Sequence, residues 1–67
     1  MVTIQVNGEA REVPNGLSVT QLVDQLGLTA NRLAIERNLE IVPRGRWSTT
    51  PVSAGDRFEI VHLVGGG

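Results

Sequence analysis

The residues of this sequence with the most distinctive chemistry are the last three, Gly65, Gly66 and Gly67, which directly follow Val64. Glycine loses more backbone entropy on ordering than any other residue, so a run of three favours neither a helix nor a strand. We therefore expect residues 65–67 to form a flexible tail that ends in one reactive group, the α-carboxylate of Gly67. Residues 1–64 are expected to form a domain that presents this carboxylate.

The carboxylate of Gly67 needs activation before a nucleophile can attack it. An α-carboxylate has a pKa of about 3.3–3.7, so it is ionised at neutral pH and is a poor electrophile. The chain has no G-x-x-x-x-G-K-[ST] motif that could hold ATP, so the ATP site is expected on a partner and no cofactor is expected on this chain. Without a Cβ, the tail could pass through a narrow channel, whereas a side chain at Gly66 or Gly67 would crowd the carbonyl. The alternative is a disordered tail without chemistry.

The other polar residues show no arrangement that predicts catalysis. The sequence has no Cys and a single His, His62, which cannot by itself build a metal site. We interpret His62 as structural or partner-contacting, and Trp47 as a packed cover over a sheet edge rather than a stacking platform. The acidic residues show no close pair, and Asp56 is expected to serve a turn. We therefore do not expect an enzyme.

Composition restricts the class of protein further. The 67 residues suffice for one domain, which buries only about 60% of its unfolded surface. Six basic residues, all Arg, against seven acidic ones give a net charge of −1, which argues against nucleic acid and anionic membranes as partners. The N-terminus lacks a signal-peptide pattern, and no apolar run approaches the roughly 20 residues of a membrane span. We expect a cytoplasmic protein that is monomeric when free.

The first half of the chain predicts a hairpin followed by a helix. Residues 1–6 and 9–13 read as strands, and Asn7-Gly8 between them is a strong signal for a two-residue turn. Ser18 and Gln21 then have the spacing of a capping box, and an apolar stripe follows them with helical periodicity. The residues of the stripe are Val19, Leu22, Val23 and Leu26. Gly27 is suited to the left-handed residue that ends a helix.

The second half predicts three further strands, 33–36, 40–42 and 56–64, with an irregular segment over 44–53. In the last strand Phe58 and Ile60 are expected to face the core, so that Val61 and Leu63 lie on the opposite face beside the tail. An exposed apolar patch often marks a partner site, so we predict a partner interface at Val61, Leu63 and Val64. The alternative is that the 44–53 segment covers one of these side chains.

The order β-β-α-β-β-β predicts an α+β fold, a mixed four- to five-stranded sheet packed on one main helix. The first and last strands are expected to be central, parallel neighbours that are joined through the helix. This architecture is the β-grasp, or ubiquitin-like, fold.

Several segments of the chain have a familiar order and spacing: Ser18–Val23 with Leu26-Gly27, Ala34–Asn38, Ile41–Arg44, Trp47, Gly55-Asp56 and Glu59–Gly67. In these segments the chain resembles the sulfur carrier family of thiamine biosynthesis. Together they cover nearly the whole chain in the family's order. The small subunit of molybdopterin synthase is a related family, but its proline pair and serine before the diglycine do not occur here.

The resemblance implies a cycle in which this chain is a recycled cosubstrate. An E1-like adenylyltransferase would use ATP to adenylate Gly67, a sulfur-donor enzyme would supply the sulfur of a thiocarboxylate, and thiazole synthase would take that sulfur. Three alternatives stay open: a sulfur carrier for molybdopterin or another acceptor, a ubiquitin-like protein modifier, and a non-covalent interaction module.

Overall fold

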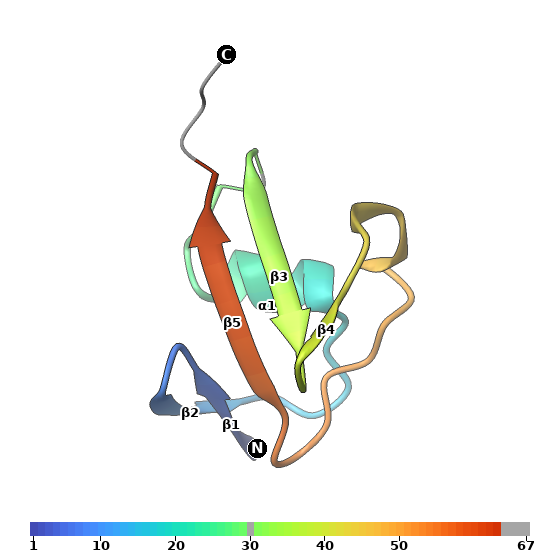
Figure 1. Ribbon diagram of the computed structural model, residues 1–67. Helices are drawn as coiled ribbons and strands as arrows, with labels where there is room; N and C mark the ends of the chain where they lie inside the picture. The colour runs from blue at the N-terminus through green and yellow to red at the C-terminus, as the bar shows by residue number, and fades with distance from the viewer. Residues whose placement is uncertain (30, 64–67) are drawn as a thin grey trace.

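In the described part of the chain, five strands in the order β2-β1-β5-β3-β4 form one mixed sheet, and a single α-helix packs on one face of it (Figure 1). This computed structural model describes residues 1–29 and 31–63. The strands are β1 (Val2–Val6), β2 (Glu9–Val13), β3 (Leu33–Arg37), β4 (Glu40–Ile41) and β5 (Arg57–His62). The α-helix is α1 (Val19–Gln25), and Arg44–Arg46 form a short 3₁₀ helix, η1.

The predicted arrangement of the first and last strands is confirmed. β5 lies between β1, to which it is parallel, and β3, to which it is antiparallel. β1 and β2 form the predicted hairpin, whose turn residues Asn7 and Gly8 have φ of 52° and 84°. Left-handed values at both central residues are those of a type I′ turn, the type that matches the twist of the flanking strands.

Helix α1 begins and ends at the predicted residues. The Ser18 hydroxyl accepts from the Gln21 N–H at 3.2 Å, and the Gln21 side chain accepts from the Ser18 N–H at 3.0 Å. At the other end Gly27 has a φ of 72°, and the Leu28 N–H donates to the Val23 carbonyl at 3.1 Å, as in a Schellman motif. Local sequence therefore fixes both ends of this seven-residue helix.

The segment between β4 and β5 is more ordered than the sequence suggested. It contains η1, which was not predicted, and it lies against the start of α1. The Val19 N–H donates to the Thr50 carbonyl at 2.9 Å, and the Thr20 N–H donates to the Trp47 carbonyl at 3.2 Å. These bonds satisfy two of the four backbone N–H groups that a helix start leaves without an intrahelical partner.

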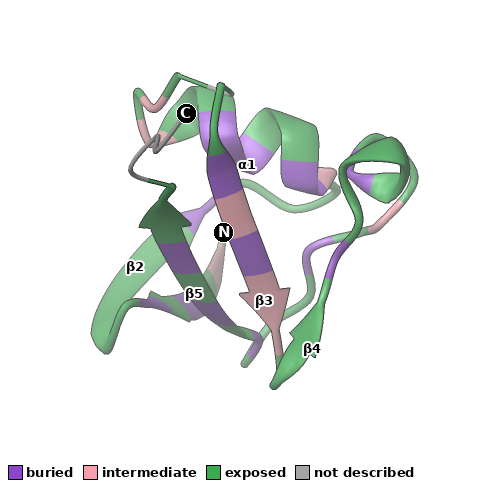
Figure 2. Cartoon of the chain, turned by 45° about the horizontal axis from the view of Figure 1, so that its top comes forward, coloured by how far each residue is buried: buried purple, intermediate pink, exposed green. Residues whose placement is uncertain are grey.

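The core lies between α1 and the inner face of the sheet (Figure 2). Its largest fully buried side chains are Phe58, Ile4, Leu22, Ile35 and Val19. Trp47 is also part of this cluster and is 4% exposed, with its indole N–H donating to the Val42 carbonyl at 2.9 Å. Val42 directly follows the edge strand β4, so Trp47 is a packed side chain at this edge of the sheet, as expected, and is not a stacking platform.

Candidate functional site

The tail predicted to carry the chemistry follows β5, and the sheet holds β5 firmly up to its last described residue. Gly65, Gly66 and Gly67, together with Val64 of the predicted interface, lie outside the described residues. On the β3 side, pairing extends to His62, opposite Leu33, and the Leu63 N–H donates to the Arg32 carbonyl at 2.6 Å. The segment that carries the tail is therefore fixed to the domain through residue 63.

On the β1 side, a side chain continues the ladder where the strand itself ends. β1 pairs with β5 only as far as Val6, opposite Phe58. Beyond that point the Asn7 amide bonds to both backbone groups of Ile60, accepting from its N–H at 2.8 Å and donating to its carbonyl at 3.0 Å. The sequence marked Asn7 only as a turn residue, and its contact with a strand 53 residues away was not predicted.

The predicted apolar patch lies on the outer face of the sheet, away from α1. Val61 and Leu63 are each 53% exposed, whereas Phe58 and Ile60 are 1% and 5% exposed. The alternation predicted for this strand is therefore confirmed, and the 44–53 segment leaves both patch residues accessible. Ala34 on β3 lies opposite Val61 and extends the apolar surface across two strands.

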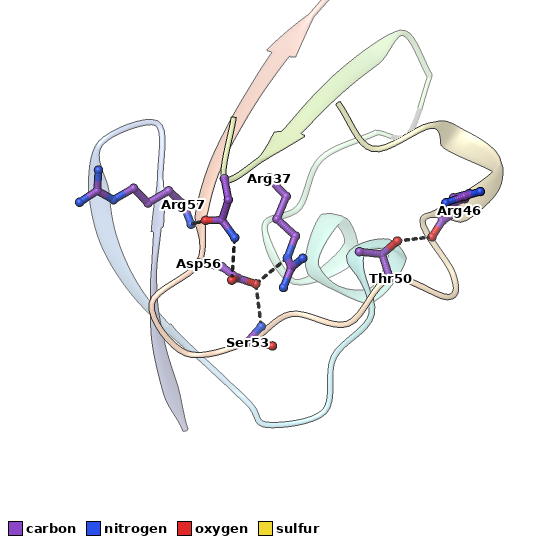
Figure 3. Close-up of polar contacts among 7 residues, drawn as sticks. Arg37, Arg46, Thr50, Ser53, Asp56 and Arg57 are labelled. Carbon is purple, nitrogen blue, oxygen red and sulfur yellow. Dashed lines mark hydrogen bonds and ion pairs between the residues drawn. The ribbon is translucent and has the colours of Figure 1, made fainter. Parts of the chain in front are cut away.

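A network of hydrogen bonds around the buried carboxylate of Asp56 fixes the start of β5 (Figure 3). Asp56 is 5% exposed, and its carboxylate accepts from the Arg37 Nε at 2.8 Å, the Ser53 N–H at 2.8 Å and the Asn38 amide at 3.1 Å. The Asn38 amide oxygen in turn accepts from the Arg57 N–H at 2.9 Å. Asp56 thus serves its turn, as predicted, and also ties the β3–β4 turn to the start of β5.

The environment of Asp56 lowers the pKa of its carboxyl. Burial alone raises this pKa, but the hydrogen bonds from Ser53, Arg37 and Asn38, with the positive charge of Arg37, together outweigh burial and hold it below the usual value. The carboxylate is therefore ionised at neutral pH. All of its contacts are internal, which identifies it as a structural anchor of β5.

The remaining candidate residues are not brought together into a reactive group. His62 lines a cavity of about 190 Å³ with Leu26 and Leu28, beside the end of β5. The Arg44 guanidinium lies over the Trp47 ring at 5.2 Å from its centroid. Among residues 1–29 and 31–63, no three His, Cys, Asp or Glu side chains are placed to share a metal ion. No helix in this part of the chain is both long and apolar enough to cross a membrane.

Two thiazole synthases contain a segment similar to this chain. The chain is 42% identical over 62 residues to thiazole synthase of Paramagnetospirillum magneticum, a match that covers 92% of this chain and 19% of that protein. It is 34% identical over 64 residues to thiazole synthase of Magnetococcus marinus. The chain therefore spans about a fifth of the length of these relatives.

Other relatives match over their whole length. The sulfur carrier protein ThiS of Escherichia coli is 31% identical over 64 residues, which cover 96% of this chain and 97% of that protein. The crystal structure of the thiamine biosynthesis protein ThiS from Geobacter metallireducens superposes with a TM-score of 0.88 at 32% identity, over 98% of this chain and all of that one. This likeness confirms the predicted β-grasp fold. A family model for the ThiS family matches residues 4–67, and the chain therefore belongs to the ThiS family.

Proposed function

We propose that this chain is a sulfur carrier for the thiazole moiety of thiamine and that Gly67 is the residue that is loaded. The observation that carries the proposal is the extent of the family match, which runs from the first strand through the three glycines to residue 67. The domain itself supports it as well, because β5 is anchored on both sides and leads directly to those glycines.

In the proposed reaction this chain contributes the Gly67 carboxylate, and the partner enzymes supply every catalytic group. A carboxylate oxygen attacks the α-phosphorus of ATP in an adenylating enzyme, pyrophosphate leaves, and an acyl-adenylate remains. The outer sulfur of a persulfide on a donor enzyme then attacks the carbonyl carbon and AMP leaves, which gives an acyl disulfide between Gly67 and the donor cysteine. A second thiol attacks the cysteine sulfur of that acyl disulfide, so that a disulfide forms between the two thiols and the Gly67 thiocarboxylate is released. A closed partner site is needed because water would hydrolyse the adenylate. Three glycines suit such a site, since they present no side chain to it.

The proposed partners are an E1-like adenylyltransferase, a sulfur-donor enzyme and a thiazole synthase. The two thiazole synthases that contain a segment similar to this chain favour the last of these, because a domain joined to an enzyme in one chain commonly works with it. In this proposal the chain is a cosubstrate rather than an enzyme, is monomeric when free, and acts in the cytoplasm.

Intact-mass spectrometry tests the proposal directly. The chain is incubated with ATP, a sulfur source and the adenylating enzyme of the same organism. We expect a mass gain equal to the exchange of one oxygen for one sulfur, which is reversed when thiazole synthase and its substrates are added. Attachment to a second protein would instead indicate a protein modifier. An unchanged mass with active partners would contradict the carrier function.

The apolar patch beside the tail gives a second prediction. Leu63→Asp is expected to leave the fold intact, because the side chain is half exposed and lies outside the core, and only its backbone bonds to Arg32. Sulfur loading is expected to fall by roughly tenfold or more, since a charge must then be desolvated against an apolar partner surface.

Gln25→Glu is the matched control for Leu63→Asp. It introduces the same negative charge at an exposed position of α1, on the layer opposite the patch. The control should be loaded at the wild-type rate, measured as initial rate by mass spectrometry. If Leu63→Asp is also loaded at that rate, the patch is not a partner interface.

A further inference from the structure

The side chain of Asn7 takes the place that a further residue of β1 would have in the sheet. The parallel pairing of β1 with β5 extends to Val6, opposite Phe58, and the Asn7 N–H donates to the Phe58 carbonyl at 2.8 Å. Two residues further along β5, the Asn7 amide accepts from the Ile60 N–H at 2.8 Å and donates to the Ile60 carbonyl at 3.0 Å. A side-chain amide has a donor and an acceptor, as a peptide group has, so Asn7 continues the ladder by one residue.

The turn at Asn7 does not by itself require this side chain. Asn7 has a φ of 52°, a region that glycine adopts without steric cost. Asn38, at the same position of the β3–β4 turn, also has a φ of 52°, and its amide contacts the opposite side of β5. It accepts from the Arg57 N–H at 2.9 Å and donates to the Asp56 carboxylate at 3.1 Å. The two asparagines therefore hold β5 from opposite sides, Asn38 at its start and Asn7 three residues later.

The two ends of β5 differ in what else holds them. At the start, the buried carboxylate of Asp56 adds an ion pair and a bond to a backbone N–H. At the other end, a cavity of about 190 Å³ lies between the strand and the end of α1, lined by Leu26, Leu28 and His62. Close packing on the inner face therefore does not fix this end of β5, and hydrogen bonds have to do so.

Beyond Ile60, the contacts that fix the described part of β5 lie on the β3 side. His62 pairs with Leu33, and the Leu63 N–H donates to the Arg32 carbonyl. Twist is larger in a two-stranded ribbon than in a wider sheet. Because the Asn7 amide keeps a neighbour on the second edge of Ile60, the change in twist begins only after that residue. Asn7 therefore sets the direction in which β5 leaves the sheet.

We infer that Asn7 is a positioning residue for the adenylation of Gly67, the step in which a carboxylate oxygen attacks the α-phosphorus of ATP and pyrophosphate leaves. The inference rests on the proposed function, because it concerns the placement of the same carboxylate. A segment as long as that from Ile60 to Gly67 spans at most about 25 Å, so a rotation of about 10° at its base moves its end by roughly 4 Å. Asn7 keeps the strand in the direction that matches the enzyme's active site.

Asn7→Gly tests the inference because it removes the amide and keeps the turn. The full chain is incubated with ATP and the adenylating enzyme of the same organism, and pyrophosphate release is followed in a single turnover. The rate at saturating enzyme is expected to fall roughly tenfold, since a misplaced carboxylate reacts slowly. The enzyme concentration that gives half the maximal rate should change by less than about twofold, because the docking surface is unchanged.

Asn38→Gly is the matched control, with the same φ and the same change of residue. It should lower the melting temperature at least as much as Asn7→Gly, because it removes two bonds beside the buried Asp56. Its single-turnover rate should stay within about twofold of the wild type, because Asn7 still holds the end of the strand. Equal losses of rate in both variants, at a temperature where circular dichroism shows both folded, would mean that the rate follows stability and would overturn the inference.

Nuclear magnetic resonance tests the geometry without any partner. In Asn7→Gly the Ile60 amide should exchange with solvent at least about tenfold faster, because it has lost its acceptor. Residual dipolar couplings should show the N–H vectors of Val61 and Leu63 turned by about 10° or more relative to the rest of the sheet. In Asn38→Gly both vectors should keep their wild-type directions. Unchanged couplings in Asn7→Gly would contradict the inference.

A second variant, Asn7→Asp, covers the case in which Asn7→Gly does not fold. Aspartate also tolerates the left-handed region and keeps an acceptor for the Ile60 N–H, but its carboxylate repels the Ile60 carbonyl. Its single-turnover rate is therefore expected to fall as well. If the wild type is adenylated and the folded Asn7 variants react at its rate, the positioning role is wrong and the carrier function stands. If an active enzyme does not adenylate the wild type, the carrier function fails and the inference with it.

Discussion

Deletion of Gly67 is expected to reduce sulfur loading by at least about a hundredfold without changing the fold. The shortened chain still ends in a glycine carboxylate, so its intrinsic reactivity is the same. Its reach, however, is shorter by up to about 3.5 Å, because one extended residue spans that distance. A misplacement of even about 1 Å at a reacting centre can cost a hundredfold in rate. Initial rates of loading, followed by intact mass, measure the effect.

The stability of the shortened chain provides the control. All of the identified core residues lie between Ile4 and Ile60, so the deletion removes no core contact. The circular dichroism spectrum and the melting temperature should match those of the full chain. Addition of one glycine after Gly67 tests the same geometry from the other side and should also slow loading. Wild-type loading by both the shortened and the lengthened chain would show that the position of the carboxylate is unimportant.

Local sequence was sufficient to predict the elements of this fold whose determinants are themselves local. The capping box of Ser18 and Gln21 and the glycine after α1 place that helix within a residue. The Asn7-Gly8 pair places the first hairpin, and alternation in β5 separates Phe58 and Ile60 from Val61 and Leu63. The caps of α1 and the Asn-Gly turn are steric or hydrogen-bonding preferences that act over four residues or fewer, and the alternation is a hydrophobic pattern within a single strand.

Features that depend on distant residues were not predictable in this way. Asp56 reads as a turn residue, and its bonds to Arg37 and Asn38 join segments 19 and 18 residues apart. Asn7 likewise reads as a turn residue, although its side-chain amide also bonds to the backbone of Ile60 in β5, beyond the end of β1. Trp47 was expected to be packed at a sheet edge, but its place in the main core cluster depends on the packing of the 44–53 segment against α1, which local sequence does not specify.

The β3–β4 turn and the pairing of β3 with β5 illustrate the same difference between local and distant determinants. Asn38-Leu39 was predicted as a turn, but the left-handed φ of Leu39 follows from the two-residue connection between β3 and β4. The repulsion between Glu36 and Glu59 depends on the register of β3 against β5, since a shift by one residue would move one glutamate to the other face. The spacing of residues along the sequence does not specify how β3 aligns with β5.

Asp56→Asn is expected to destabilise the domain by about 2–3 kcal/mol, through loss of a buried, ion-paired acceptor. The asparagine oxygen can still accept from Arg37 and Ser53, but its NH₂ group then faces the NH₂ group of Asn38. Reversal of the Asn38 amide would restore that contact and lose the bond from the Arg57 N–H. One buried polar group therefore stays unsatisfied in either arrangement. For a domain of this size the melting temperature should fall by roughly 15–20 °C.

The dependence of stability on pH tests whether the negative charge of Asp56 accounts for the stability that Asp56→Asn loses. The pKa of Asp56 is lower in the folded chain than its unfolded value of about 3.9, so its contribution is complete above that value and decreases as the pH falls toward the folded pKa. Denaturation is measured at a series of acidic pH values. The difference in unfolding free energy between the wild type and Asp56→Asn should become smaller as the pH falls, because the wild type then loses the same charge by protonation. Asp24→Asn, which removes a carboxylate at an exposed position of α1, should change stability by less than about 0.5 kcal/mol. An equal loss in both variants, or a loss from Asp56→Asn that does not vary with pH, would indicate that the Arg37–Asp56 pair does not anchor β5.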